Sequence, residues 1–434
     1  MGRVPDDRAE AVFEDYKAAY SLQQAIAESE RCLYCFDAPC IQACPTGIDI
    51  PTFIRKIATG NLKGSAKTIF DSNILGMSCA RVCPVEVLCV GDCVYNREDS
   101  PPIQIGKLQR FATDRAYEEG WSFSEAGEPT GKKVACIGAG PASLAAAHKL
   151  RQLGHSVTLF DKRDVVGGLN ITGVAPYKIR ADQAEAEVEW VLGIGGIEVR
   201  TGVSIPTDVS WSDLESEFDA IFLGFGLGPD RFIGGEEGLS NAHGAVEFIE
   251  SFKLGPVDLS GVKRALVLGG GNTAVDAVRE LAGLGVADVR MVYRGDESGM
   301  SGYSHEWKAA KVDNVRGVWR TQPVGYEVEG DRVTGVRCVT VDADKKPIPG
   351  SEHVLPADLV LVAIGQAKLG ELVSDLSGVE VEWGRVVAGE DGATGRPGVY
   401  CGGDCRNGGK EVVNAVAEGR DAAIAMNAYL MGAN

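Results

Sequence analysis

Residues 132–150, KKVACIGAGPASLAAAHKL, predict a short buried strand, a glycine-rich turn and a helix with small residues on its inner face. Gly138 and Gly140 permit a tight turn and a close approach of the backbone to a pyrophosphate, which the free N–H groups of a helix N-terminus attract. A second strand, SVTLF, is followed by an acid that can accept hydrogen bonds from a ribose diol. Together these features predict a dinucleotide site formed by Gly138, Gly140, Pro141, Ala142, Asp161 and Lys162.

The same pattern occurs a second time in ALVLGGGNTAVDAVREL, residues 265–281. Its next strand, DVRMVYR, ends with Arg294, and the apolar run LVLVAIGQ at residues 359–366 predicts a returning strand. Short apolar runs that alternate with glycine-rich turns and helices are typical of parallel sheets built from βαβ units. We therefore predict a second nucleotide site, formed by Gly269, Gly271, Asn272, Thr273, Arg294 and Gly365.

Composition narrows the class of protein. The chain has 434 residues, 56 of them glycine, and a formal net charge of −18. This acidity argues against nonspecific nucleic-acid binding, which requires a basic surface. The first residues lack the apolar segment of a secretory signal, and no apolar run reaches the ~18–20 residues that span a bilayer. We expect a soluble, cytoplasmic protein that binds neither nucleic acid nor membranes.

Eight of the twelve cysteines lie in one short region and have a regular spacing. The pattern is Cys32-x2-Cys35-x4-Cys40-x3-Cys44-Pro, then Cys79-x3-Cys83-Pro, then Cys89-x3-Cys93. Disulfides are unfavourable in a reducing compartment, so this density indicates metal binding or redox chemistry. A close run can supply three ligands to an iron–sulfur cage, with the fourth from a distant segment. Zinc is the alternative, but zinc sites usually show two CxxC units and this region has one.

The cysteine region resembles the N-terminal domain of dihydropyrimidine dehydrogenase and of the glutamate synthase small subunit. The resemblance implies two [4Fe–4S] clusters and leaves Cys79 without iron. One implied ligand of the second cluster is the amide of a glutamine in place of a cysteine thiolate. This substitution lowers the negative charge of the ligand shell and should shift the reduction potential of that cluster. The implied ligands are Cys32, Cys35, Cys40 and Cys93 for one cluster, and Cys44, Cys83, Cys89 and Gln109, within IGKLQRFATD, for the other.

Two further motifs resemble those of two-dinucleotide flavoproteins, namely VGGL at residues 166–169 and VYCGGDCRNGGKEVVNAVAEGRDAA at residues 399–423. The resemblance implies FAD at the first nucleotide site and NADH or NADPH at the second. Arg294 is followed by glycine, whereas NADPH-using relatives often have two adjacent basic residues there, so we favour NADH. Lys178 stands where the family usually carries arginine. The further implied FAD contacts are Gly168, Leu169, Lys178, Gly403, Asp404 and Val412.

The predicted fold class is α/β, with a helical N-terminal iron–sulfur domain followed by two Rossmann-like nucleotide-binding domains. The polar segment GEPTGKK, residues 127–133, marks the first boundary. The FAD-binding domain is discontinuous and the NAD(P)-binding domain is inserted in it. The expected domains are residues 1–128 for iron–sulfur, 129–255 and 367–434 for FAD, and 256–366 for NAD(P).

The resemblance implies a division of labour between cofactors. Hydride transfer from nicotinamide to flavin requires stacking and exclusion of water, and no protein acid or base. No CxxC lies beside the flavin motifs, which disfavours a redox-disulfide mechanism. We expect an electron-input subunit whose partner is an FMN- and iron–sulfur-containing catalytic subunit that reduces a pyrimidine. The alternatives are a glutamate synthase small subunit, the flavoprotein subunit of an electron-bifurcating transhydrogenase, and a noncatalytic iron–sulfur scaffold subunit.

Overall fold

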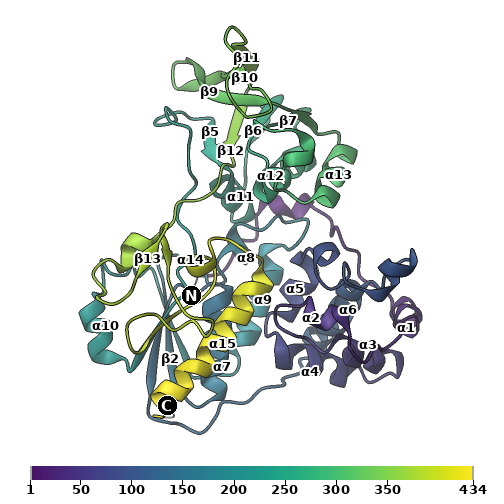
Figure 1. The fold of residues 1–434 in the computed structure, drawn as a ribbon, viewed down its shortest axis with the longest axis vertical. Coiled ribbons are helices and arrows are strands. Elements are labelled where there is room, and N and C mark those ends of the chain that lie inside the picture. Colours follow the sequence, from purple (N-terminus) through teal and green to yellow (C-terminus); the bar gives the residue numbers. More distant parts are fainter. Residues whose placement is uncertain (1, 433–434) are drawn as a thin grey trace.

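The computed structural model describes residues 2–432 and has a helical N-terminal part beside two sheet-containing parts (Figure 1). Helices of the first part begin at polar caps: Ser21 accepts from the Gln24 amide, Asp49 from Thr52 and Asn61 from Gly64. The elements are η1 (Ala9–Val12), α1 (Leu22–Glu30), α2 (Pro39–Gln42), α3 (Ile50–Ala58), α4 (Leu62–Ser72), α5 (Gly76–Val82), η2 (Val85–Val87), η3 (Val94–Glu98) and α6 (Ile105–Glu118).

The first sheet has five parallel strands in the order β15-β4-β1-β2-β3. Its central strands are apolar along their length because helices cover both faces. β15, near the end of the chain, pairs with β4, so this domain is discontinuous, as predicted. Its elements are β1 (Lys133–Ile137), α7 (Pro141–Gln152), β2 (Ser156–Asp161), α8 (Leu169–Thr172), α9 (Ala181–Leu192), β3 (Ile197–Thr201), α10 (Trp211–Glu217), β4 (Ala220–Leu223), η5 (Gly370–Val373), β13 (Val381–Glu382), β14 (Arg385–Val386), β15 (Val399–Cys401), α14 (Asp404–Asn407) and α15 (Val412–Leu430).

The second sheet is also five-stranded and parallel, in the order β5-β12-β6-β7-β8. A three-stranded antiparallel sheet, which the sequence did not predict, extends from it at the top of Figure 1. The elements are β5 (Ala242–Gly244), α11 (Ala245–Lys253), β6 (Arg264–Leu268), α12 (Asn272–Gly283), β7 (Asp288–Val292), η4 (Glu297–Gly299), α13 (Ser304–Val312), β8 (Arg316–Val318), β9 (Thr321–Glu329), β10 (Arg332–Thr340), β11 (His353–Pro356) and β12 (Leu359–Val362).

One predicted boundary lies inside the second sheet's unit. β5 pairs with β12, and α11 packs on the same sheet, although the boundary predicted between residues 255 and 256 assigns both to the first domain. A three-residue strand is too short to show a period, and the polar stretch at residues 255–263 was the stronger local signal. The change between sheets occurs earlier, in the segment between β4 and β5.

The predicted fold class is confirmed: a helical N-terminal domain precedes two parallel Rossmann-like sheets. The two glycine-rich turns follow β1 and β6, which are the central strands of their sheets. Both turns therefore stand at the carboxyl edge of a parallel sheet, where such folds bind their ligands. Among the described helices, none is both long enough and apolar enough to cross a membrane.

Candidate functional site

The turn after β1 has the backbone geometry of a phosphate cradle. Gly138 adopts φ +88°, and a Cβ there would stand 2.6 Å from the Gly224 carbonyl oxygen. A Cβ on Gly168 would be 2.8 Å from the Gly140 Cα, whereas a Cβ on Gly140 would meet only the Gly168 Cα, at 3.9 Å. Only glycine fits such a turn, and the open side leaves room for a pyrophosphate at the start of α7.

Asp161, the residue predicted to bind a ribose, lies at the end of β2. Its carboxylate accepts hydrogen bonds from the Ala139 amide at 2.8 Å and the Arg163 amide at 2.9 Å. An ionised carboxylate has about four acceptor sites, so it can still receive a ribose hydroxyl. Lys162, the next residue, is exposed. Asp161 therefore fixes the glycine-rich turn and remains able to bind the ligand.

The opposite wall of this cradle comes from the C-terminal segment. Gly403 has φ +75°, and a Cβ there would lie 3.0 Å from that of Ala142. Asp404 accepts from the Lys410 amide at 3.2 Å, and burial raises the pKa of its carboxyl group. α15 then begins at Val412. A Cβ on Gly403 would also lie 3.7 Å from that of Ala415 in the first turn of α15. The starts of α7 and α15 therefore meet at Gly403, and the residues present fit a bound FAD.

The turn after β6 is built in the same way but is more open. Gly269 has φ +149° and sits against the Ala363 carbonyl, and Gly270 lies against the ring of Tyr293. A Cβ on Gly271 would have no atom nearer than 3.6 Å, so the backbone there can approach a ligand. α12 begins with Asn272, whose Oδ1 accepts from the Tyr303 amide at 2.9 Å. This turn fits a nucleotide pyrophosphate.

The other predicted contacts of the second site surround this turn. Thr273 is partly buried in the first turn of α12, and Gly365 is exposed with φ +103°. Arg294 is exposed at the end of β7, and the hydrogen bonds and ion pairs found among the described residues do not involve it. Its guanidinium is therefore available to meet the adenosine end of a nicotinamide dinucleotide.

The side chain of Lys178 forms ion pairs with the second domain. Its ammonium lies 2.9 Å from Asp276 of α12 and 2.8 Å from Glu306 of α13, and its side chain is only 11% exposed. Burial by itself lowers the pKa of Lys178, but the two carboxylates outweigh it and raise the pKa above its usual range. Its predicted role beside the flavin stays a prediction, and the structure adds a role at the domain interface.

Two residues that the sequence did not single out connect the two nucleotide sites. Tyr303, next to the start of α12, donates to Glu411, the residue before α15, at 2.6 Å. Burial and the Glu411 carboxylate raise the pKa of Tyr303, so its hydroxyl stays protonated as the donor. The two residues are 108 positions apart, and no local pattern could have paired them.

Four cysteines line one pocket of the N-terminal domain, and we call them the outer set: Cys32, Cys35, Cys40 and Cys93. Burial, with a smaller contribution from the charges of the other three cysteines, raises the pKa of Cys40 to about 12. Thiolates gathered this closely repel one another unless a cation compensates them. The outer set, which the family resemblance implied, therefore fits an iron cluster.

A second group, which we call the inner set, comprises Cys44, Cys83 and Cys89. Burial raises the pKa of Cys89, and Cys83, Cys44 and Cys40 add to this, so these thiols are neighbours. Cys79 lies beside Cys83, one helical turn away in α5. Gln109 is buried and donates its amide N–H to the Gly76 carbonyl at 2.8 Å, which leaves its oxygen free to act as a ligand.

Within residues 2–432, no three histidine, cysteine, aspartate or glutamate side chains are arranged to hold one metal ion. An iron–sulfur cage instead distributes its thiolates around several iron atoms.

Helix α15 joins the inner set to the nucleotide sites. Val413 packs in the same apolar cluster as Cys79 and Cys83, and Arg420 donates to the carbonyls of Thr46 and Ser72, both at 2.8 Å. The first turn of α15 faces the cradle described above, and Figure 1 shows α15, coloured yellow, extending beside the N-terminal helices. One helix therefore touches both the predicted flavin site and the cysteine domain.

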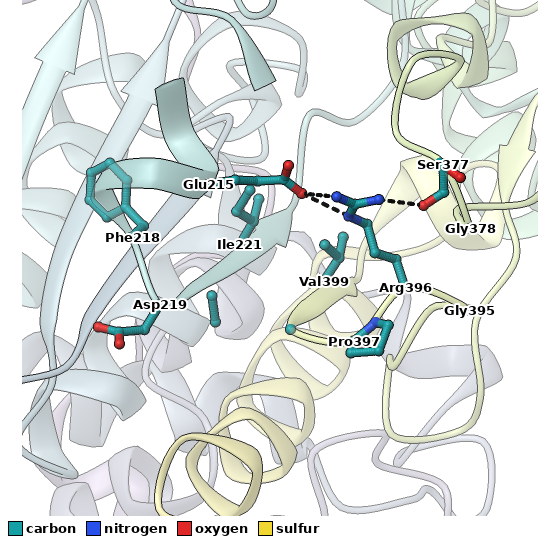
Figure 2. A pocket seen from close by; sticks show the side chains of 12 residues that line it. Glu215, Phe218, Asp219, Ile221, Ser377, Gly378, Gly395, Arg396, Pro397 and Val399 are labelled. Carbon is teal, nitrogen blue, oxygen red and sulfur yellow. Dashed lines mark hydrogen bonds and ion pairs between the residues drawn. The ribbon is translucent and has the colours of Figure 1, made fainter. Parts of the chain in front are cut away.

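A cavity of about 610 Å³ lies at the other edge of the first sheet, where β4 and β15 begin. Figure 2 shows Arg396 inside it, bound to Glu215 at 2.6 Å and to the Ser377 carbonyl at 2.6 Å. The guanidinium is thus neutralised by its own neighbours. Because ligands of parallel α/β sheets bind at the carboxyl edge, this cavity is separate from the candidate site.

Comparisons with known proteins agree with this geometry. Residues 8–121 match a family described as dihydropyrimidine dehydrogenase domain II, 4Fe-4S cluster, and residues 132–419 match the pyridine nucleotide-disulphide oxidoreductases. The chain is 35% identical over 432 residues to the glutamate synthase (NADPH) small chain of Escherichia coli K12, covering 93% of this chain and 91% of that protein.

Two further relatives extend the comparison. The NAD-dependent dihydropyrimidine dehydrogenase subunit PreT of Escherichia coli K12 is 33% identical over 415 residues, covering 96% of each chain. The thioredoxin reductase of T. acidophilum superimposes with a TM-score of 0.56 at 21% identity, covering 69% of this chain and 99% of that one. The structural likeness concerns the fold of the two-sheet part alone.

Proposed function

We propose that this protein is the electron-input subunit of a larger redox enzyme. The chain belongs to the pyridine nucleotide-disulphide oxidoreductases and to the family of the glutamate synthase small chain and PreT. Members of this family combine an NAD(P)H- and FAD-binding fold with a 4Fe–4S domain. The observation that supports the proposal best is α15, which touches the FAD cradle at its start and contacts the cysteine domain through Val413 and Arg420.

The nucleotide sites would act by positioning and by excluding water. The turns at Gly138 and Gly269 would hold the two pyrophosphates at the N-termini of α7 and α12. Tyr303 and Glu411 join the domains by a hydrogen bond and would help to exclude water there. Bound FAD would supply the chemistry that converts a hydride into single electrons. No protein acid or base is needed for this step.

The cysteine domain would hold two [4Fe–4S] clusters, and the thiol arrangement supports this assignment. Cys32, Cys35, Cys40 and Cys93 form the outer site. The inner site takes Cys44, Cys83 and Cys89, with the Gln109 oxygen as fourth ligand. Cys79 is the competing inner ligand because it adjoins Cys83. Replacing Cys79 with serine should leave the iron content unchanged, whereas replacing Cys89 should lower it.

The outer set lies beside exposed apolar side chains that fit a protein partner. Phe36 is 99% exposed and Leu33 is 55% exposed, and both belong to the loop that carries Cys32 and Cys35, just before the helix α2 that carries Cys40. Apolar side chains this exposed, next to a redox centre, support docking of an electron-accepting subunit. We assign the partner as an FMN- and iron–sulfur-containing subunit that reduces pyrimidines, which the similarity to PreT supports. The similarity to glutamate synthase small chains supports a glutamate synthase large subunit as the second candidate.

The test is an anaerobic titration of the purified protein with NADH and with NADPH, with flavin and iron quantified. The expected result is flavin bleaching, with one FAD and about eight irons per chain on the basis of two cubane clusters. Cys93→Ser should lose iron, whereas the matched control Cys338→Ser, in β10 of the second domain, should retain it. Flavin that neither nucleotide reduces would refute the proposal. The physiological acceptor is then identified by adding each candidate partner with its substrate: uracil with the pyrimidine-reducing subunit, or glutamine and 2-oxoglutarate with the glutamate synthase large subunit.

A further inference from the structure

An extended segment at residues 13–20, which we call the strap, crosses the junction of all three domains. The Tyr16 amide donates to the Tyr177 carbonyl of the first sheet domain at 2.8 Å, and Arg279 of α12 lies over the Tyr16 ring at 4.9 Å. Arg110 of α6 pairs with Asp15 at 2.6 Å and also donates to the Lys17 carbonyl. These contacts fix the strap, and with it the backbone of Lys17, against the cysteine domain.

The Lys17 ammonium reaches the loop that carries an inner cysteine. Its Nζ donates to the Cys83 carbonyl at 2.8 Å. Lys17 is the cation that acts most strongly on the Cys83 thiol, whereas Glu411 is the carboxylate that acts on it. The ionisable groups that face Lys17 are Cys83, Glu86, Lys178 and Glu306. The inner set thus has a lysine held beside it by contacts that do not depend on iron.

We propose that Lys17 sets the reduction potential of the inner iron–sulfur cluster by placing a fixed positive charge beside Cys83. This inference rests on the proposed function, since it requires a cluster at the inner set. Reduction adds one electron, derived from NAD(P)H through the flavin, and one unit of negative charge, while no bond forms or breaks. A nearby cation stabilises that added charge and therefore raises the potential. Lys17 is a positioning residue for electron transfer, because it touches the ligand loop and not the substrate.

Lys17 lies beside the cluster that would receive electrons first from the flavin. Cys83 of the inner set lies near Glu411, the residue before α15, and α15 begins at the FAD cradle. Electrons leaving the flavin would meet the inner set before the outer set, whose cysteines lie in a separate pocket. A higher potential at the inner position favours the first single-electron step away from the flavin.

The test is a spectroscopic redox titration of the holoprotein, in which electron paramagnetic resonance follows each cluster. Lys17→Gln keeps an N–H donor but removes the charge. We expect it to weaken reduction of one cluster about tenfold, a downward shift of about 59 mV for a one-electron couple. Lys17→Arg should retain the wild-type potential. The matched control is Lys56→Met, because Lys56 donates to Thr68 at 2.7 Å and has no cysteine partner.

The outcomes separate this inference from the proposed function. Unchanged potentials in Lys17→Gln, with full iron content, would overturn the role of Lys17 and leave the proposed function standing. A wild-type protein without a reducible cluster signal would overturn both. If Lys17→Gln loses iron, Lys17→Met takes its place, since it fills the same volume without a charge. An equal shift in Lys56→Met would show that the effect is not specific to Lys17.

Discussion

Helices α7 and α12 begin at similar glycine-rich turns but bury different chemistry. The buried face of α7 is mainly alanine and leucine, and it packs tightly against α15 of its own domain. The buried face of α12 also carries Asp276 and Glu280, which meet charged groups at the junction with the first sheet domain. One turn is thus embedded in an apolar core, and the other belongs to a charged interface between domains. The difference teaches that the turn motif determines what can bind, while the following helix determines how the domain is attached.

The largest expected effect comes from removing the cation of the charged interface. Lys178→Met leaves Asp276 and Glu306 together without their shared partner. Breaking a buried pair in this way costs about 3–5 kcal/mol. The free energy of unfolding, measured with urea, should fall by that amount.

Lys67→Met is the matched control for this substitution. Lys67 pairs with Asp71 on an exposed helix surface, with both side chains about half exposed, and such pairs contribute at most about 1 kcal/mol. Equal losses in the two variants would contradict the importance of the interdomain charges.

The second effect tests the apolar side of the comparison. A Cβ on Gly419 would stand 2.0 Å from the Ala142 carbonyl oxygen, so Gly419→Ala forces α15 away from α7. Overpacking of this kind costs about 1–3 kcal/mol, although alanine in a helix would otherwise gain about 1 kcal/mol. The temperature of thermal unfolding and the amount of bound flavin per chain should both decrease. In Gly261→Ala, where the added Cβ meets open space, neither should change.

The third effect concerns Arg294, at the second nucleotide site, whose turn at Gly269 is the more open of the two. Arg294→Ala should lower kcat/KM for NADPH about tenfold, which is about 1.4 kcal/mol, and that for NADH by less, because the 2′-phosphate carries the additional charge. Arg320→Ala is the control, since its guanidinium is paired with Asp296 at 2.6 Å. Steady-state kinetics with a dye acceptor measures both. Equal losses for the two coenzymes would assign Arg294 to the adenine and not to a phosphate.

The smallest expected effect is a pH dependence at the charged interface. Lys253 is fully buried and donates to the Val174 and Ile179 carbonyls at 2.7 and 2.9 Å, and burial lowers its pKa to about 8 from 10.5. Above pH 8 the unfolded state binds more protons than the folded state, so this group makes stability rise with pH up to about 10.5. Between pH 8 and 9 the rise should be about 1 kcal/mol or less. Lys253→Met should lack it in urea unfolding, and an identical pH profile would refute the assignment.

Much of the fold was predictable because its signals are local. The turns at Gly138 and Gly269 follow apolar runs, and both occur at the carboxyl edge of a parallel sheet as expected. The cysteine spacing predicted a metal or redox site, and the grouping into two sets came from the resemblance to dihydropyrimidine dehydrogenase; the four outer thiols line one pocket. β5 was missed because a three-residue strand shows no distinct period. The antiparallel sheet was missed because register shifts in β10, between Val333 and Gly335 and between Arg337 and Cys338, interrupt the alternation along its nine-residue strands.

The candidate site was less predictable where it depends on distant residues. Tyr303 and Glu411 are 108 positions apart, and Lys17 and Cys83 are 66 apart. A tyrosine or lysine on its own carries no sign of such a partner, because the side chain is common on any surface. Lys178 shows the same limit: the family resemblance implied a contact with the flavin, and the tertiary structure adds Asp276 and Glu306.

The sequence by itself determined the fold class, the two nucleotide turns and the iron–sulfur character of the first domain. These depend on glycine conformations, on strand and helix periods and on ligand spacing, which are properties of neighbouring residues. Only the tertiary structure decided that α15 connects the cradle to the inner cysteines, that charges join the domains and that Lys17 reaches Cys83. The physical reason is that burial and charge pairing arise between segments brought together by packing, and packing depends on the whole chain.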